Sequence, residues 1–121
     1  MEDRKIKILI CGTRKKGYGL LVRQELDKIK LNSDVRWKDF EIVEGCCPDS
    51  ADTYAEKWAI ENAIKVNHFP SKTGNYLKRN VEMVKLADTI IAFWDGWSYG
   101  TAHTIATAIS LGKKVEVMLL K

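Results

Sequence analysis

The chain has 121 residues, of which 45% are hydrophobic and 30% are charged, and its net charge is +4. This length suits a single domain over residues 1–121, and the composition excludes a disordered or collagen-like chain. The sequence contains no apolar run near the roughly 18 residues of a membrane span, and no signal-peptide pattern, so we expect a soluble cytoplasmic protein.

Five apolar segments rich in β-branched residues predict strands, at residues 6–11, 40–44, 64–69, 89–94 and 114–119. The fourth segment is nearly all apolar, which is typical of a central parallel strand buried on both faces. Apolar residues at helical spacing predict helices between the strands, most clearly from Ala51 to Asn62. This alternation predicts an α/β fold, a Rossmann-like three-layer sandwich with a five-stranded parallel sheet and helices on both faces.

Right-handed crossovers place the strand-to-helix loops of such a sheet at one edge, where α/β proteins bind ligands. The loops to consider are residues 12–19, 45–52, 70–79 and 95–101. In the first loop, Gly12 lets a ligand approach the backbone closely, and Thr13 and Arg14 can bind an anion at the start of the helix. The loop matches neither the dinucleotide-binding glycine pattern nor a Walker A loop, so a tight turn with solvated charges is the alternative.

The second and third loops carry polar candidates for the same site. Gly45 ends the predicted second strand, and Ser50 and Asp52 are candidates for ligand contacts. The alternative is that Asp49 or Ser50 caps the following helix, with Asp52 in its first turn. A carboxylate at this position could bind ribose hydroxyl groups. Arg79 and Asn80 lie at the start of an otherwise apolar helix, which favours a polar ligand over packing, with a surface arginine as the alternative.

The fourth loop follows the most apolar predicted strand and leads into the last helix. It offers ligand contacts at Asp95, Gly96, Ser98, Gly100 and Thr101. Free main-chain N–H groups at the start of this helix would suit a phosphate, and the exposed faces of Trp97 and Tyr99 would suit a base. A glycine turn with aromatic residues that cover the core is the alternative.

The cysteines and histidines give no sign of a metal site or a bound cofactor. Cys11, Cys46 and Cys47 form no C-x-x-C motif or zinc spacing, which favours reduced thiols. His68 and His103 are isolated in the sequence, which favours structural roles for both.

Four segments together resemble the SLOG superfamily, the Rossmann-like group that includes the LOG ("lysine decarboxylase-like") proteins and the DprA/Smf domain. They are Gly12-Thr13-Arg14, Gly45-x4-Ser50-Ala51-Asp52, Arg79-Asn80-x2-Met83-Val84, and Asp95-Gly96-x-Ser98-x-Gly100-Thr101-Ala102-x-Thr104. The resemblance spans most of the chain and is strongest to small stand-alone members from bacteria, archaea and their viruses. It implies the cytoplasm of a prokaryotic cell or of an infected host.

The resemblance also implies a site for a nucleotide or a nucleotide-derived molecule. In the family, Gly100 and Thr101 match the phosphate-binding motif, Arg79 matches an arginine that contacts the phosphoribosyl group, and Gly12 and Thr13 match first-loop contacts. Enzymes of the family place a glutamate three residues after the motif threonine, where this chain has Thr104. A threonine lacks the carboxylate that ribosyl transfer needs.

We therefore expect a module that senses, carries or sequesters a phosphate-bearing nucleotide-derived ligand. The alternative is an N-glycosidic bond hydrolase or ribosyltransferase, with Arg79, Asp95 and Asp52 as catalytic candidates. A third alternative is single-stranded nucleic-acid binding through the basic first loop and Trp97. We also expect a homodimer or higher homo-oligomer, in which Trp37 and Trp58 are candidates for the interface, with core packing as the alternative for Trp58.

Overall fold

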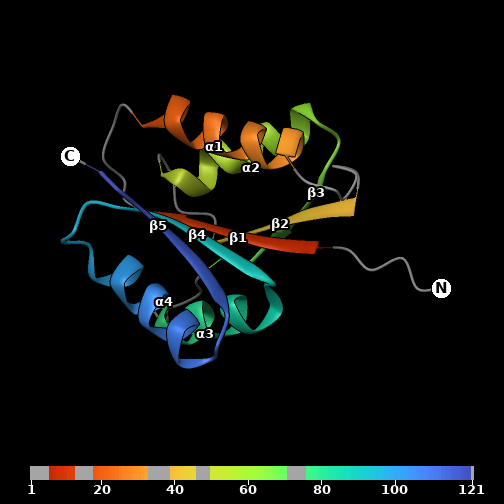
Figure 1. Cartoon of the computed structure of the whole chain (residues 1–121). Coiled ribbons are helices and arrows are strands. Elements are labelled where there is room, and N and C mark those ends of the chain that lie inside the picture. Colours follow the sequence, from red (N-terminus) through yellow and green to blue (C-terminus); the bar gives the residue numbers. More distant parts are fainter. Residues whose placement is uncertain (1–5, 13–17, 33–38, 46–49, 71–75, 121) are drawn as a thin grey trace.

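A computed structural model describes residues 6–12, 18–32, 39–45, 50–70 and 76–120 of the chain. Within these ranges strands and helices alternate strictly along the sequence (Figure 1). The elements are β1 (Ile6–Gly12), α1 (Gly19–Asn32), β2 (Phe40–Glu44), α2 (Ala51–Glu61), β3 (Lys65–His68), α3 (Tyr76–Leu86), β4 (Thr89–Trp94), α4 (Tyr99–Ser110) and β5 (Lys114–Leu119).

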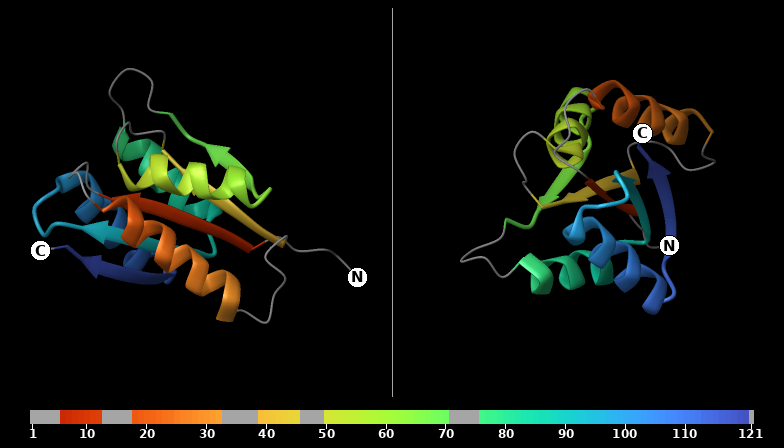
Figure 2. Two further views of the ribbon diagram at one scale, coloured as in Figure 1. Left: turned by 90° about the horizontal axis from the view of Figure 1, so that it is seen from above. Right: turned by 90° about the vertical axis from the view of Figure 1, so that its left-hand side faces the viewer.

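The five strands form one sheet in the order β3-β2-β1-β4-β5, and every neighbouring pair is parallel. Helices α1 and α2 cover one face of the sheet, and α3 and α4 cover the other (Figures 1 and 2). The predicted three-layer α/β fold is confirmed. The order reverses between β1 and β4, and this is the switch point at which parallel sheets of this kind bind ligands.

Alternating side chains of the central strands fill two separate cores. From β1, Ile8 and Ile10 pack with α1 and α2, whereas Leu9 and Cys11 pack with α3 and α4. Each of these four side chains is less than 9% exposed. Burial on both faces explains why the central strands are almost continuously apolar. The alternation also determines which helix layer each residue at a strand end faces.

Trp37 and Trp58 are the two large aromatic residues that the sequence suggests for a subunit interface. Trp58 packs in the core between the sheet and α1/α2 with only 3% of its surface exposed. Its indole Nε1–H donates a hydrogen bond of 2.8 Å to Oδ1 of Asp27. Core packing therefore accounts for Trp58, and Trp37 lies outside the described residues.

None of the helices in the described ranges has the length and apolar character that a bilayer crossing requires.

Candidate functional site at the carboxyl edge of the sheet

Gly45 lies directly after β2 and joins the sheet to the beginning of α2. Its main-chain N–H donates a 2.9 Å hydrogen bond to Oδ2 of Asp52. Ser50 is the N-cap of α2, and its Oγ accepts a 3.1 Å hydrogen bond from the N–H of Asp52. The capping role of Ser50 is therefore confirmed. Both polar side chains are buried, so this contact holds α2 at a fixed place against the strand end.

Arg79 reaches the same glycine from the opposite helix layer. Its Nη1 donates a 2.8 Å hydrogen bond to the carbonyl oxygen of Gly45, and its Nη2 donates a 3.1 Å bond to Oδ1 of Asn80. Asn80 is 3% exposed, and its Nδ2 donates a 3.4 Å bond to the carbonyl oxygen of Gly100. These contacts connect the end of β2 with α2, α3 and α4 through six residues, which we call the Gly45 network: Gly45, Ser50, Asp52, Arg79, Asn80 and Gly100.

The guanidinium of Arg79 offers more hydrogen-bond donors than its contacts with the described residues use. Gly45 and Asn80 each take one of its N–H groups. The Nε atom is buried and has no hydrogen-bond partner among the described residues. Unpaired buried donors are rare in folded proteins because they lose hydration without replacing it. The arrangement therefore leaves a cationic group with capacity for an oxygen-rich ligand.

The loop after β4 is organised by Asp95. Its Oδ1 accepts hydrogen bonds of 2.8 Å from the N–H groups of both Trp97 and Ser98, and its Oδ2 accepts a 2.9 Å bond from the Ser98 hydroxyl. Gly96 adopts a φ of +86°, a conformation that favours glycine. Asp95, Gly96 and Ser98 thus form a defined turn, and both carboxylate oxygens of Asp95 already hold this turn.

Helix α4 begins at Tyr99, with Ser98 as its N-cap residue. The first turn of any α-helix leaves main-chain N–H groups without partners inside the helix, and here these belong to Tyr99, Gly100 and Thr101. Thr104 is 2% exposed, and its Oγ1 donates a 3.1 Å hydrogen bond to the carbonyl oxygen of Gly100. The hydroxyl of Thr104 is thus buried and engaged within its own helix.

The predicted site residues fall into three groups. Hydrogen bonds unite six of them in the Gly45 network, and Asp95, Gly96 and Ser98 form the turn before α4. Gly12 ends β1 and packs against Phe93 of β4, and Thr101 is buried in the first turn of α4. Thr13 and Arg14 lie outside the described residues, as do Cys46 and Cys47.

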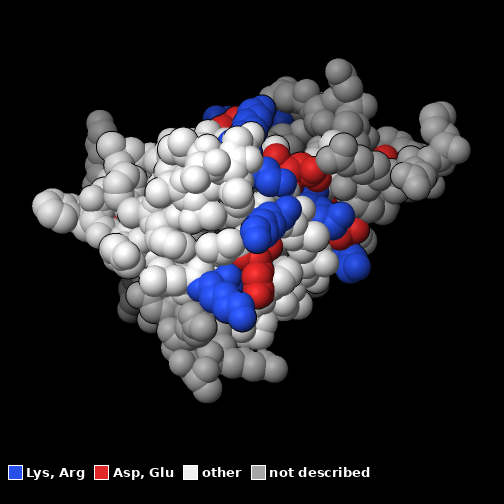
Figure 3. All heavy atoms as spheres, turned by 90° about the horizontal axis from the view of Figure 1, so that it is seen from below, with Lys and Arg blue, Asp and Glu red and all other residues white. Residues whose placement is uncertain are grey.

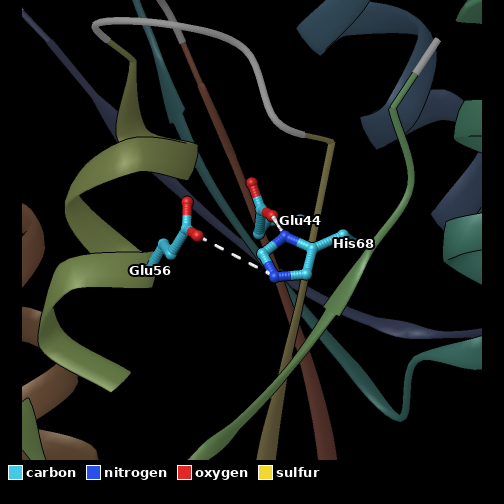
Figure 4. A group of neighbouring side chains, drawn as sticks. All are labelled: Glu44, Glu56 and His68. Carbon is cyan, nitrogen blue, oxygen red and sulfur yellow. Dashed lines mark hydrogen bonds and ion pairs between the residues drawn. The ribbon is translucent and has the colours of Figure 1, made fainter. Parts of the chain in front are cut away.

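One group of polar side chains at this edge is absent from the sequence-based prediction. Glu44, Glu56 and His68 each offer one ligand-type atom, and these three atoms all lie within 4.8 Å of one another (Figure 4). They come from β2, α2 and β3, so no local spacing in the sequence brings them together. The signal that could have found them is a charged residue at the end of an apolar predicted strand, because Glu44 follows Val43 directly.

A scan against models of known protein families and a search of curated proteins both find no match to this chain.

Proposed function

We propose that the chain binds a phosphorylated nucleotide or a nucleotide-derived small molecule at the carboxyl edge of the sheet. The observation that carries this proposal is the Gly45 network, in which Arg79 is fixed at the strand end while its buried Nε–H has no described partner. A module of this kind senses, carries or sequesters its ligand in the cytoplasm.

The chemistry of this edge suits a phosphate group. Arginine binds phosphate oxygens through parallel N–H donors, and the fixed plane of Arg79 reduces the conformational entropy lost on binding. Asn80 joins Arg79 to Gly100, so the guanidinium and the beginning of α4 are parts of one hydrogen-bonded unit. The positive end of the α4 dipole and its first-turn N–H groups add a second attraction for an anion.

The resemblance to the SLOG superfamily supports the same proposal. The motifs behind that resemblance include Arg79, Asn80 and Gly100, which the Gly45 network connects. We include membership of this superfamily in the proposal. Its basis is the Rossmann-like parallel fold together with these motifs.

Binding is favoured over cleavage of an N-glycosidic bond. A hydrolase or ribosyltransferase needs a carboxylate that faces the ribosyl carbon. Thr104 has no carboxylate and its hydroxyl is engaged by Gly100, while Asp95 holds the turn before α4. Incubation with nucleoside monophosphates, followed by chromatography, should therefore release no free base.

The test of nucleotide binding is calorimetry with a panel of adenine and guanine nucleotides, cyclic oligonucleotides and ADP-ribose. We expect at least one member to bind, and Arg79→Lys to weaken that binding by about tenfold or more, because lysine keeps the charge but loses the parallel donors. Lys78→Met is the matched control, since Lys78 is an exposed neighbour on the same helix. This control should bind like the wild type.

Two results would overturn the proposal: no panel member binds to the wild type, or the Arg79 and Lys78 variants lose the same amount of affinity. Circular dichroism and urea denaturation of each variant separate lost binding from lost folding. A ligand that binds more weakly in both variants would indicate general electrostatic attraction and not a site built around Arg79.

Single-stranded nucleic acid is the weaker alternative. On the face covered by α3 and α4, basic and acidic side chains of the described residues share one band and form no continuous basic area (Figure 3). Trp97 is 89% exposed and could stack on a base, while the basic first loop lies outside the described residues. Binding to labelled single-stranded DNA should therefore be weak and should vanish at moderate salt.

Self-association is also part of the proposal. Large apolar side chains are exposed on helix α4, on the segments directly before and after it, and on β5, namely Trp97, Tyr99, Ile109, Leu111, Val117 and Leu119. β5 is an edge strand, and no other strand among the described residues pairs with the outer side of its backbone. We propose that this region contacts a second copy of the chain, and light scattering after size-exclusion chromatography tests it: a monomeric mass would contradict it.

A further inference from the structure

Glu44 is a carboxylate that the fold buries completely at the carboxyl end of β2. Its exposed fraction is 0%, although charged side chains are almost never fully buried without a partner. The parallel register of β2 and β3 places His68 beside it. The Nδ1 of His68 lies 2.5 Å from Oε1 of Glu44, and this contact holds the imidazole ring in one orientation.

The second ring nitrogen of His68 faces another carboxylate. Its Nε2 lies 3.8 Å from Oε1 of Glu56, which projects from α2 toward β3 (Figure 4). This distance is too long for a hydrogen bond. It is close to the separation of two ligand atoms that share one metal ion, since bonds of about 2.1 Å to zinc at a tetrahedral angle separate the ligand atoms by about 3.4 Å.

We propose that a divalent transition-metal ion of the zinc class binds between Nε2 of His68 and the carboxylate of Glu56, with Glu44 as the residue that orients the histidine. Histidines that bind metals commonly donate their other N–H to a carboxylate, which fixes the ring and increases its basicity as a ligand. The Glu44–His68 contact has this form. Imidazole and carboxylate are both suitable ligands for zinc.

The exposure of the three residues agrees with an open metal site. The side chains of His68 and Glu56 are 46% and 35% exposed, so an ion can enter from solvent, whereas the side chain of Glu44 is fully buried behind the ring. His68 and Glu56, the two ligands that the described residues provide, leave coordination positions for water or for an anionic ligand. The charge of the ion would also offset the two carboxylates that converge on one imidazole.

The position of the site relates it to the Gly45 network, although the metal proposal does not depend on nucleotide binding. Glu44 directly precedes Gly45, and Glu56 lies one helical turn after Asp52 on α2. A metal at His68 would therefore lie at the same edge of the sheet. Calorimetry with the metal alone tests this inference separately, so failure of either proposal leaves the other intact.

The experiment is a titration of the full chain with Zn²⁺, measured by calorimetry, and a second titration with Co²⁺, measured by visible absorption. We expect one ion per chain in the wild type. His68→Gln and Glu56→Gln should each weaken binding by more than about tenfold, and Glu44→Gln by about 10- to 100-fold, the range typical of lost outer-shell partners. His103→Gln and Glu116→Gln are matched controls that should bind like the wild type.

The histidine variant also distinguishes this site from binding by thiols, because it keeps all three cysteines. Zinc binding that survives His68→Gln, or a wild type that binds no ion, would overturn the inference. The side chains of His68 and Glu56 are partly exposed, so their substitution should leave the fold intact, as circular dichroism can check. If Glu44→Gln fails to fold, the other two variants decide the question.

Discussion

Gly12 and Gly45 lie at the carboxyl ends of neighbouring strands, and the sequence predicts ligand contacts for both. Their surroundings differ. A Cβ atom at Gly12 would lie 2.5 Å from the carbonyl oxygen of Phe93 and 2.9 Å from its Cβ. A Cβ atom at Gly45 would lie 2.8 Å from Nη1 of Arg79 and 3.2 Å from Oδ2 of Asp52.

This difference separates a glycine that the fold needs from one that the candidate site needs. Gly12 is paired in register with Phe93, so its crowding comes from the neighbouring strand itself. A strand in the middle of a sheet cannot move without loss of its hydrogen bonds. Gly45 instead makes room for the flexible end of Arg79, which could move aside, but only by leaving its place at the strand end.

The largest effect on stability should come from Gly12→Ala. The added methyl group would overlap the carbonyl oxygen and the Cβ of Phe93 in β4, and we expect the free energy of unfolding to fall by about 3 kcal/mol. Urea denaturation measures it. Gly112→Ala is the control: its Cβ would meet open space, so only its φ of +70° opposes the change, at about 1 kcal/mol. Equal losses in the two variants would contradict the packing role of Gly12.

Gly45→Ala should instead lower ligand affinity more than stability. The guanidinium of Arg79 would have to leave the carbonyl oxygen of Gly45, which we expect to cost about 1 kcal/mol of stability and at least about tenfold in nucleotide affinity. Urea denaturation and calorimetry on the same sample measure both quantities. If this variant binds nucleotide like the wild type, the position of Arg79 at the strand end does not matter for binding.

Much of the fold could be predicted because buried positions recur in the sequence as apolar residues with the period of a strand or a helix. The apolar run at residues 89–94 predicts a strand buried on both faces, and β4 lies inside the sheet between β1 and β5 with residues 90–93 all less than 9% exposed. The ends of elements were less accurate. The predicted third strand covers residues 64–69, whereas β3 is Lys65–His68, because Ile64 is buried just before the pairing with β2 begins.

The candidate site was predictable only where topology alone determines proximity. Gly45 and Arg79 follow consecutive predicted strands, so a parallel sheet places both at one edge. The contact of Glu44 with His68 depends on the register of β2 and β3 and not only on topology. No turn fixes that register, because a helix connects the two strands. An isolated histidine in the sequence therefore gives no sign of its partner, so the sequence indicates neither the Glu44–His68 contact nor the cluster around it.

The smallest effect on stability should come from loss of the exposed ion pair between α1 and α2. This loss gives a reference value with which the effects of the two glycine variants can be compared. Arg23 donates hydrogen bonds to both carboxylate oxygens of Glu61. This hydrogen bonding, with the charge of Arg23, holds the pKa of Glu61 below its ordinary value of 4.5. Because both side chains are in water, solvent screening should keep the stabilisation small.

The pH dependence of this pair follows from the direction of the shift. A carboxyl group with a lower pKa in the folded state binds protons more readily when the chain is unfolded, so its stabilisation is present above pH 4.5. It is lost as the pH falls through the folded-state pKa. Thermal melting of the wild type and Glu61→Gln should therefore show a small difference in Tm at pH 7 that closes in acid and in high salt. A difference that stays constant across this pH range would mean that Glu61 acts through packing and not through its charge.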